Sequence, residues 1–444
     1  MSILLVDATK NMESYNIALI GCGTVGSGVA RLLLEQSARL EARAGRPLVL
    51  RKVVVLDPAK RRDVALPKHL LTTDLREVLQ DRSIQLAVEV VGGVDWAKRT
   101  ILDLLAAGKD VVTANKALLA EHGAEIFDAG RRHGRAIAFE ASVAGGIPII
   151  AALTQCLAAN QIISLQGILN GTSNFILTGM SEAGRSYAEA LKEAQGRGYA
   201  EADPSMDVDG TDAAHKLAIL AQIAFGVVVP MSAIQRRGIT DIQQADIRFA
   251  KELGYTIKLL AEAWLDGQYL AMHVSPVLLR HLTPLAQVRD AFNAINVIGD
   301  AVGHTLYYGR GAGQMPTASA VVADIIDMAV GRAQRTFQTL RLWSGKDNGI
   351  TLRPATSVKT RFYLRLLVQD RPGVLAEVAG VLARHNISIA SVIQHEALED
   401  HEGDNVHLVI MTHAAMTANF VKILEELDRL TCVAAPSVYY PVED

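Results

Sequence analysis

The sequence predicts an α/β protein of three parts: an N-terminal doubly wound, Rossmann-type domain, a central α+β domain and a C-terminal ferredoxin-like βαββαβ domain. Three observations lead to this prediction. The chain has 444 residues, about three times the ~150 typical of one domain. Its first third alternates short Val- and Ile-rich runs with longer helical patterns, which is typical of a parallel sheet. The segment 361–444 has a strand and helix order of its own.

The first part is expected to span residues 1–141, with roughly 309–340 returning to it. Its Val, Ile and Ala runs lack polar alternation, which indicates strands covered on both faces. We expect strands at 16–20, 48–56, 86–91, 110–112 and 136–139. Helical patterns pass through 32–43, 95–107 and 117–133. This alternation predicts a nucleotide-binding domain.

The second part, 142–308, mixes apolar helices with strands expected at 162–169, 269–277 and 294–297. Such a mixture is typical of an α+β domain, which we expect to provide substrate binding, catalysis and dimerisation. Residues 310–340 have a helical pattern again. The polar, Gly- and Pro-containing stretch 341–360 is interpreted as a linker.

The third part, 361–444, is expected to be a separate domain. Strands are predicted at 362–368, 387–393, 406–412 and 433–440, and helices at 374–385 and 419–430. The resulting β-α-β-β-α-β order is the ferredoxin-like arrangement.

Composition excludes several classes of partner. The formal net charge of −3 gives no general attraction to nucleic acid or to an anionic membrane. The uncharged stretch 141–181 is interrupted by Gln and Asn, so we interpret it as buried core and not as a membrane span. Three widely spaced cysteines argue against a disulfide framework and for the cytoplasm. The N-terminal extension before residue 16 receives no role.

A glycine-rich loop, Gly21-Cys-Gly23-Thr-Val-Gly26, follows the first predicted strand and opens a helix. Glycines permit a tight turn and close approach of the backbone to a pyrophosphate, and the helix N-terminus attracts its charge. A plain strand-to-helix turn is the alternative, but the flanking elements favour a dinucleotide site. Asp57 after the second strand suits NAD, whereas the basic run 60–62 suits NADP, so both cofactors stay open.

A carboxylate–lysine cluster occupies residues 201–216. Asp212 and Lys216 are four residues apart and therefore share one face of a predicted helix. A surface ion pair is the simplest explanation, but Lys216 is followed by Leu-Ala-Ile-Leu. Partial burial among apolar residues would suit the lysine to proton transfer.

The sequence around this cluster resembles the motif of a known enzyme family. Residues 194–216 follow the order A-x3-G-Y-A-x2-D-P-x2-D-V-x-G-x-D-x3-K, which is similar to the signature of homoserine dehydrogenases. Three further segments agree with this family: Thr-Ala-Asn-Lys at 113–116, Ile-Leu-Asn-Gly-Thr-Ser-Asn-Phe-Ile-Leu at 168–177, and Gly-Ala-Gly-Gln-Met-Pro-Thr-Ala-Ser at 311–319. The resemblance covers residues 17–444.

The resemblance implies reversible reduction of L-aspartate 4-semialdehyde to L-homoserine with NAD(P)H, a step towards threonine and methionine. Lys216 would donate the proton to the aldehyde oxygen, and Lys116 would assist near the nicotinamide. A zwitterionic substrate needs a carboxylate for its ammonium group, and Glu201 would supply it. The remaining implied substrate contacts are Asp207, Asp212 and Thr172. The implied cofactor contacts are Gly21, Gly23, Thr24, Val25, Gly26, Lys116, Gly198 and Gly313.

Members of this family can also hold a monovalent cation, usually sodium. The matching segment provides one carboxylate and several backbone carbonyls, a donor set that suits a hard ion. Its implied ligands are Glu140, Val143, Gly145 and Ile147. The alternative is an ordinary Gly-rich connection that positions Pro148.

The C-terminal part resembles an ACT domain, a small-molecule-sensing module that usually pairs with another copy. The segment Asp-Arg-Pro-Gly-Val-Leu at 370–375 joins its first strand and helix. The implied effector contacts are Asp370, Gly373 and Asn386, and the implied effector is an amino acid, commonly threonine. A purely structural dimerisation domain is the alternative. The pairing habit implies a homo-oligomer, a dimer or a tetramer.

Two other functions compete with this one. An aldehyde dehydrogenase acting through a thiohemiacetal needs a nucleophilic cysteine with a base. Neither Cys22, inside the glycine loop, nor Cys156, in an apolar helical segment, suits that role. A catalytically silent, nucleotide-binding amino acid sensor would not need both Lys216 and its acidic neighbours. Their joint presence favours the enzyme.

Overall fold

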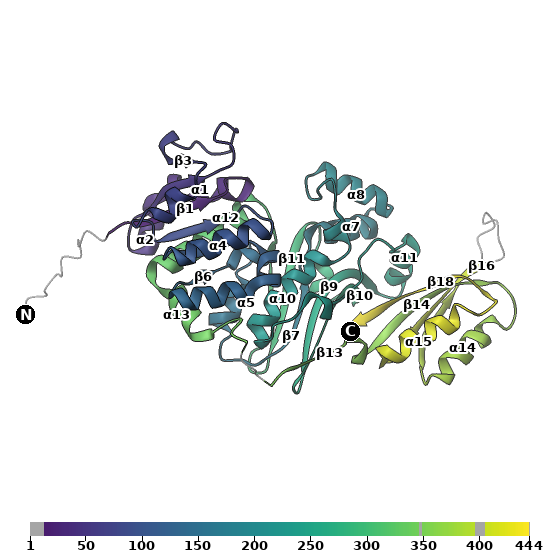
Figure 1. The fold of residues 1–444 in the computed structure, drawn as a ribbon. Coiled ribbons are helices and arrows are strands. Elements are labelled where there is room, and N and C mark those ends of the chain that lie inside the picture. The colour runs from purple at the N-terminus through teal and green to yellow at the C-terminus, as the bar shows by residue number, and fades with distance from the viewer. Residues whose placement is uncertain (1–12, 346–348, 396–404, 444) are drawn as a thin grey trace, which may run out of the picture. The chain divides into compact units, whose positions relative to one another are not determined.

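The structure is a computed structural model that describes residues 13–345, 349–395 and 405–443 (Figure 1). It contains two compact units, which we describe separately. The first comprises residues 1–159, 218–228 and 309–348, and the second residues 160–217, 229–308 and 349–444. This division differs from the predicted three domains, because the C-terminal module is grouped with the central strands. The N-terminal extension largely lies outside the described residues.

The first unit is built on a six-stranded parallel sheet in the order β3-β2-β1-β4-β5-β6. Its strands are β1 (Tyr15–Ile20), β2 (Leu48–Val54), β3 (Leu71–Thr72), β4 (Leu86–Glu89), β5 (Asp110–Thr113) and β6 (Ile137–Ala138). The predicted doubly wound domain is therefore confirmed. Strand order reverses between β1 and β4, and in such sheets the ligand crevice opens beyond the carboxyl ends of the strands at this point.

Helices flank this sheet. They are α1 (Thr24–Glu35), α2 (Ser37–Ala44), α3 (Arg76–Gln80), α4 (Asp95–Ala106), α5 (Lys116–His133), α6 (Ile149–Ala151), α12 (Gln314–Val330) and α13 (Arg332–Leu340). The helical pattern predicted through 32–43 proves to be two helices that meet at Gln36. The return of 309–340 is tight, because a Cβ atom on Gly28 of α1 would lie 2.9 Å from the Cβ of Ala318 on α12.

The second unit contains a twelve-stranded sheet, whose main path is β12-β11-β7-β9-β10-β18-β14-β16-β15. Strands β8 and β13 pair with β10, and β17 pairs with β14. The strands of the central region are β7 (Ile162–Ile168), β8 (Gln235–Arg236), β9 (Tyr255–Asp266), β10 (Tyr269–Arg280), β11 (Phe292–Gly299), β12 (Gly303–Arg310) and β13 (Thr351–Arg353). Since β13 lies inside the predicted linker and pairs with β10, part of that linker is a strand.

Five helices accompany the central strands: α7 (Gly171–Glu182), α8 (Tyr187–Gly196), α9 (Ser205–Val208), α10 (Thr211–Phe225) and α11 (Gln244–Glu252). Helix α7 begins at an Asn170 cap, whose side-chain oxygen accepts from the backbone N–H of Ser173. Within the described ranges, we find no helix with the length and apolar character needed to cross a membrane.

The C-terminal module has the predicted order β14 (Lys359–Gln369), α14 (Val374–Arg384), β15 (Ile389–Gln394), β16 (Asn405–Thr412), β17 (Ala415–Met416), α15 (Thr417–Leu427) and β18 (Val433–Glu443). The short β17 is an addition. Strand β18 runs past its predicted end, and its last residues pair with Leu278 and Leu279 of β10. The sheet of the module therefore continues the sheet of the central region.

Candidate active site

The glycine loop of the first unit has the geometry that a pyrophosphate needs. Gly21 has a φ of +94°, and a Cβ atom on Gly26 would lie 2.2 Å from the Gly21 carbonyl oxygen. In contrast, a Cβ on Gly23 would have no atom within 4 Å. Gly23 and Thr24 are exposed at the start of α1. The loop thus presents an open backbone at a helix N-terminus, which fits a dinucleotide phosphate.

A buried carboxylate organises the neighbouring loops at the same edge of the sheet. Glu89 ends β4, and its Oε1 accepts from the backbone N–H groups of Val91 and Gly92. Its Oε2 accepts from the hydroxyl of Thr113, the last residue of β5. Burial raises the pKa of Glu89, and these hydrogen bonds oppose the rise. Lys116 follows this arrangement as the first residue of α5.

The loop after β2 contains the residues considered for contacts to the cofactor's ribose. Asp57 Oδ1 accepts from the backbone N–H of Ala59 at 2.8 Å. Arg62 donates to the carbonyls of Asp57 and Lys60. Asp57 is exposed and Arg62 is partly exposed, and both side chains shape their own loop.

In the second unit, Lys216 is buried, with 8% of its surface exposed. It lies on α10 as predicted, and its Nζ donates to Asp212 Oδ2 at 2.7 Å and to the Leu169 carbonyl at 2.6 Å. Asp212 is 6% exposed. The pair is therefore not a surface ion pair, and the partial burial predicted for the lysine is confirmed.

Asn170 extends this pair into a network. Its Nδ2 donates to Asp212 Oδ2 at 2.9 Å and to Asp207 Oδ1 at 2.7 Å. Burial, with Asp212 nearby, raises the pKa of Asp207, whereas the Asn170 hydrogen bond opposes the rise. The Asn170 amide thus connects Asp207 to Asp212, and Asp212 connects them to Lys216. We name Lys216, Asp212, Asn170 and Asp207 the lysine network.

The other predicted substrate contacts are less closely connected. The Thr172 hydroxyl donates to the carbonyl of Tyr199 at 2.6 Å, which fixes the chain just before Glu201. Glu201 is exposed in the loop between α8 and α9, and its carbonyl accepts from Gln195.

Two predicted cofactor contacts are glycines with a positive φ. Gly198 is exposed in the second unit with a φ of +74°. Gly313 belongs to the first unit, where it precedes α12 with a φ of +121°.

In the segment predicted to hold a cation, the Glu140 carboxylate is hydrogen-bonded to a helix. Glu140 is 7% exposed, and its two oxygens accept from the backbone N–H groups of Ile150 and Ala151 in α6. Burial raises its pKa to about 7. The described residues contain no cluster of three or more His, Cys, Asp and Glu side chains suited to a metal ion. The other predicted ligands, Val143, Gly145 and Ile147, are buried.

The predicted effector contacts lie at two ends of the C-terminal module. Asp370 and Gly373 lie between β14 and α14, where Gly373 has a φ of +94°. Asp370 accepts from Gln394, the last residue of β15. Asn386 precedes β15 and has a φ of +56°. Because β14 and β15 both pair antiparallel with β16, Asn386 lies at the opposite end of the module.

Comparisons with known proteins show which family the chain belongs to. A family model described as homoserine dehydrogenase matches residues 148–326, and one described as the homoserine dehydrogenase NAD binding domain matches 21–140. The homoserine dehydrogenase of Bacillus subtilis is 40% identical over 432 residues, which cover 97% of this chain and 99% of the relative. The chain belongs to the homoserine dehydrogenase family. It is therefore an oxidoreductase that uses NAD(P).

Further comparisons extend the likeness to the whole chain. An ACT domain model matches residues 362–432. The homoserine dehydrogenase of Neisseria gonorrhoeae is 41% identical, with 96% of this chain and 98% of the relative covered. A crystal structure of a homoserine dehydrogenase from Thiobacillus denitrificans matches with a TM-score of 0.90 at 40% identity, covering 97% of this chain and 99% of that one. The resemblance inferred from the sequence is thus confirmed.

A solved hyperthermophilic archaeal homoserine dehydrogenase in complex with NADPH matches with a TM-score of 0.61 at 28% identity. The match covers 72% of this chain and 98% of that chain. The likeness at this level concerns the fold and the family.

Sequence analysis missed two residues of the site. Asn170 lies inside a quoted motif, but its contacts to Asp207 and Asp212 span 37 and 42 residues of sequence. Glu89 is an ordinary strand residue in the sequence. Only its position at the end of a predicted parallel strand could have indicated it, since polar residues at such ends gather at one edge of the sheet.

Proposed function

We propose that this chain reduces L-aspartate 4-semialdehyde reversibly to L-homoserine, with Lys216 as the proton donor to the aldehyde oxygen. The observation that carries this proposal is the buried lysine network. An ammonium group has three N–H donors. Asp212 and the Leu169 carbonyl take two of the Lys216 donors. The third is left for a substrate oxygen.

The acidic members of the network would orient this lysine. Asp212 lies 2.7 Å from Nζ, and Asn170 fixes Asp212 by a second hydrogen bond. A donor held in this way needs little reorganisation when negative charge develops on the substrate oxygen. Glu201 would contact the substrate ammonium from its exposed loop, and Lys116 would be a second donor.

The cofactor would be NADP or NAD. When bound, its reduced nicotinamide supplies the hydride. The open backbone at Gly23 and Thr24 would hold the pyrophosphate. The archaeal relative bound to NADPH supports NADP as one choice.

Initial rates of the purified full chain test this function. We expect turnover of homoserine with NADP or NAD, and a raised KM for homoserine in Glu201→Gln with a smaller change in kcat. Lys192→Met, an exposed change on α8, is the matched control. Cofactor binding without any turnover would instead support a silent sensor. An unaltered KM would remove Glu201 from the substrate site.

We further propose that threonine inhibits the enzyme through the ACT module. Because Asn386 and Asp370 lie at opposite ends of the module, one effector touching both needs two copies of the chain. Strand β15 is the last strand of the sheet path, and its residue Val392 is 38% exposed. An open edge with an apolar side chain suits pairing with another copy. The proposed oligomer is accordingly a dimer or a tetramer.

Mixed oligomers test this arrangement. Asp370→Asn and Asn386→Ala should each weaken threonine inhibition in homo-oligomers. Co-expression of the two variants should restore one intact site per pair, and inhibition with it. Deleting 350–444 is a poorer test, because β13 and β18 pair with β10 and their loss would uncover that strand. Undiminished inhibition in both variants would contradict the proposal.

The proposal also includes a bound monovalent cation and a location in the cytoplasm. Sodium would be held by Glu140 together with the backbone carbonyls of Val143, Gly145 and Ile147. A reducing compartment agrees with three free thiols, Cys22, Cys156 and Cys432. Equal rates in sodium and choline chloride at one ionic strength would count against the cation.

A further inference from the structure

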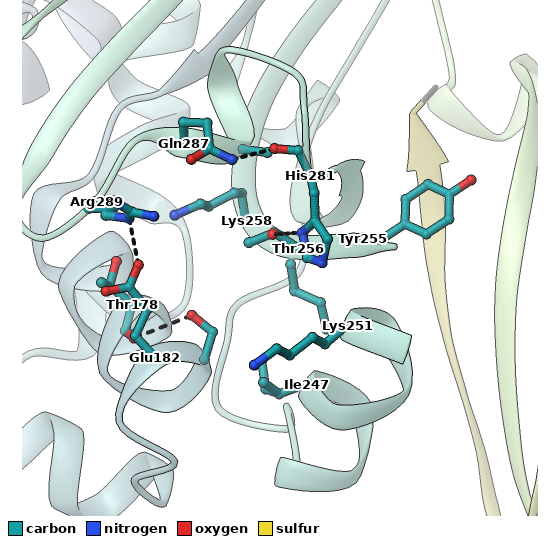
Figure 2. Close-up of a pocket in the computed structure, with 13 residues that line it drawn as sticks. Thr178, Glu182, Ile247, Lys251, Tyr255, Thr256, Lys258, His281, Gln287 and Arg289 are labelled. Carbon is teal, nitrogen blue, oxygen red and sulfur yellow. Dashed lines mark hydrogen bonds and ion pairs between the residues drawn. The ribbon is translucent and has the colours of Figure 1, made fainter. Parts of the chain in front are cut away.

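A cavity of about 540 Å³ lies in the second unit, among α7, α11, the start of β9 and the loop that follows β10 (Figure 2). None of its lining residues belongs to the lysine network. Its lining contains more positive than negative side chains. The charged or titratable members are Lys251, Lys258, Arg289, His281, Tyr255 and Glu182.

Lys258 is the buried cation of this cavity. Only 2% of its surface is exposed. Its Nζ donates to Asn174 Oδ1 at 3.0 Å and to the carbonyl of Val288. Both hydrogen-bond acceptors are neutral, and the carboxylates of Glu182 and Asp290 act on its charge only through space. A buried ammonium with no carboxylate hydrogen bond is costly, so a third N–H that can contact an anion is a strong recognition element.

The position of Lys258 is fixed by its neighbours. Asn174 Nδ2 donates to the carbonyls of Val288, Asp290 and Phe292, which hold the loop after β10 against α7. The ammonium and the loop therefore share one rigid scaffold. Such preorganisation lowers the entropic cost of binding a ligand.

The more exposed part of the cavity adds two cations. Lys251 is an exposed residue of α11, and Arg289 donates to Glu182 at 2.5 Å. His281 Nδ1 is 2.7 Å from the Thr256 hydroxyl. The lining thus contains three ammonium or guanidinium groups and one carboxylate, which is paired with Arg289. Figure 2 shows the side chains of Lys258 and Arg289 pointing toward one another across the cavity.

We propose that this cavity binds a small oxyanion, either phosphate or the carboxylate of a small organic acid, through Lys258, Lys251 and Arg289. Binding of the anion to Lys251 would affect α11, the helix to which this residue belongs. The same helix carries Asp246, which is held by Arg365 of the C-terminal module. Anion binding is thereby connected to a helix that contacts the C-terminal module.

Calorimetric titration of the full chain tests the site. Inorganic phosphate and succinate are titrated separately at one ionic strength, with saturating NADPH so that the glycine loop is occupied. We expect saturable binding of at least one anion, with one site per chain. Lys251→Met and Arg289→Gln should each weaken it about tenfold to hundredfold, the range of one hydrogen bond to a charged group.

Lys192→Met removes an exposed lysine elsewhere in the same unit and should leave the affinity unchanged. Lys258→Met should abolish binding. If this variant does not fold, the proposal is tested by the Lys251 and Arg289 variants, whose side chains are exposed. Preference for phosphate or for succinate identifies the source of the oxyanion. The proposal is overturned if neither anion binds saturably, or if binding is the same in the Lys251 and Arg289 variants as in the wild type.

Discussion

The buried ion pair between Arg365 and Asp246 offers a quantitative test of how the C-terminal module is attached. Arg365 on β14 donates from Nε to Asp246 Oδ1 at 2.7 Å and from Nη2 to Asp246 Oδ2 at 3.1 Å. The side chains are 5% and 0% exposed. Tyr363 also donates to Asp246, and Arg365 to Gln243. We expect the change Arg365→Met to leave a buried, uncompensated carboxylate.

The size of the effect follows from this burial. Breaking a buried ion pair by removing one partner costs roughly 3–5 kcal/mol. Asp246→Asn removes the other partner, and it also weakens the N-terminal cap of α11, where Asp246 Oδ2 accepts from the Gln243 N–H. That cap is worth about 1 kcal/mol more. The double variant should cost less than the sum, because the two sites interact directly.

Urea unfolding followed by circular dichroism measures these free energies. Arg429→Met is the matched control in the same module, because its ion pair with Glu425 is 79% and 78% exposed. We expect no measurable loss from that control. If Arg365→Met were no more destabilising than Arg429→Met, the module would not be held by this pair, and our account of its attachment would be wrong.

Three further predictions concern single side chains. Burial lowers the pKa of Lys258 to about 8, below its unfolded value of about 10.4. The folded state therefore disfavours the charged form, so the stability present above pH 10.4, where Lys258 is neutral, is lost as pH falls towards 8. The unfolding free energy of the wild type relative to Lys258→Met should therefore rise by on the order of 1 kcal/mol per pH unit between pH 8 and 10; a flat difference in urea titrations would contradict it. Asn170→Leu should lower kcat about tenfold to hundredfold, since it removes hydrogen bonds to two carboxylates, and an unchanged kcat would remove Asn170 from the site. Gly26→Ala should abolish dinucleotide binding in a fluorescence titration, because its Cβ would clash with the Gly21 carbonyl, whereas Gly23→Ala should be milder and equal effects would contradict this.

Local patterns were sufficient for much of the fold. The first sheet, the glycine loop and the order of the C-terminal module all rest on short-range signals: apolar runs, turn residues and helical periodicity. Strand β9 escaped prediction because its sequence, Tyr-Thr-Ile-Lys-Leu-Leu-Ala-Glu-Ala-Trp-Leu-Asp, is rich in helix-forming residues. Pairing along its whole length with β10 overrides that preference. A single sequence contains no signal for such a partner.

The same limit applies to the site. Asp212 and Lys216 could be paired because they are one helical turn apart. Asn170 could not be joined to them, because the contact depends on how β7 and α10 pack. Asn386 was grouped with Asp370 by resemblance, whereas strand direction separates them within one chain. The continuation of β18 into the central sheet likewise depends on a long-range pairing.

The most direct test of the central claim is the turnover number of Lys216→Met for homoserine oxidation, measured together with the dissociation constant for the dinucleotide. General acid–base catalysis by a positioned side chain contributes about 10²- to 10⁴-fold. We predict a loss of kcat in that range with unchanged cofactor affinity, because the glycine loop contains no part of the lysine network. A variant that binds the cofactor normally and turns over at nearly the wild-type rate would contradict the account.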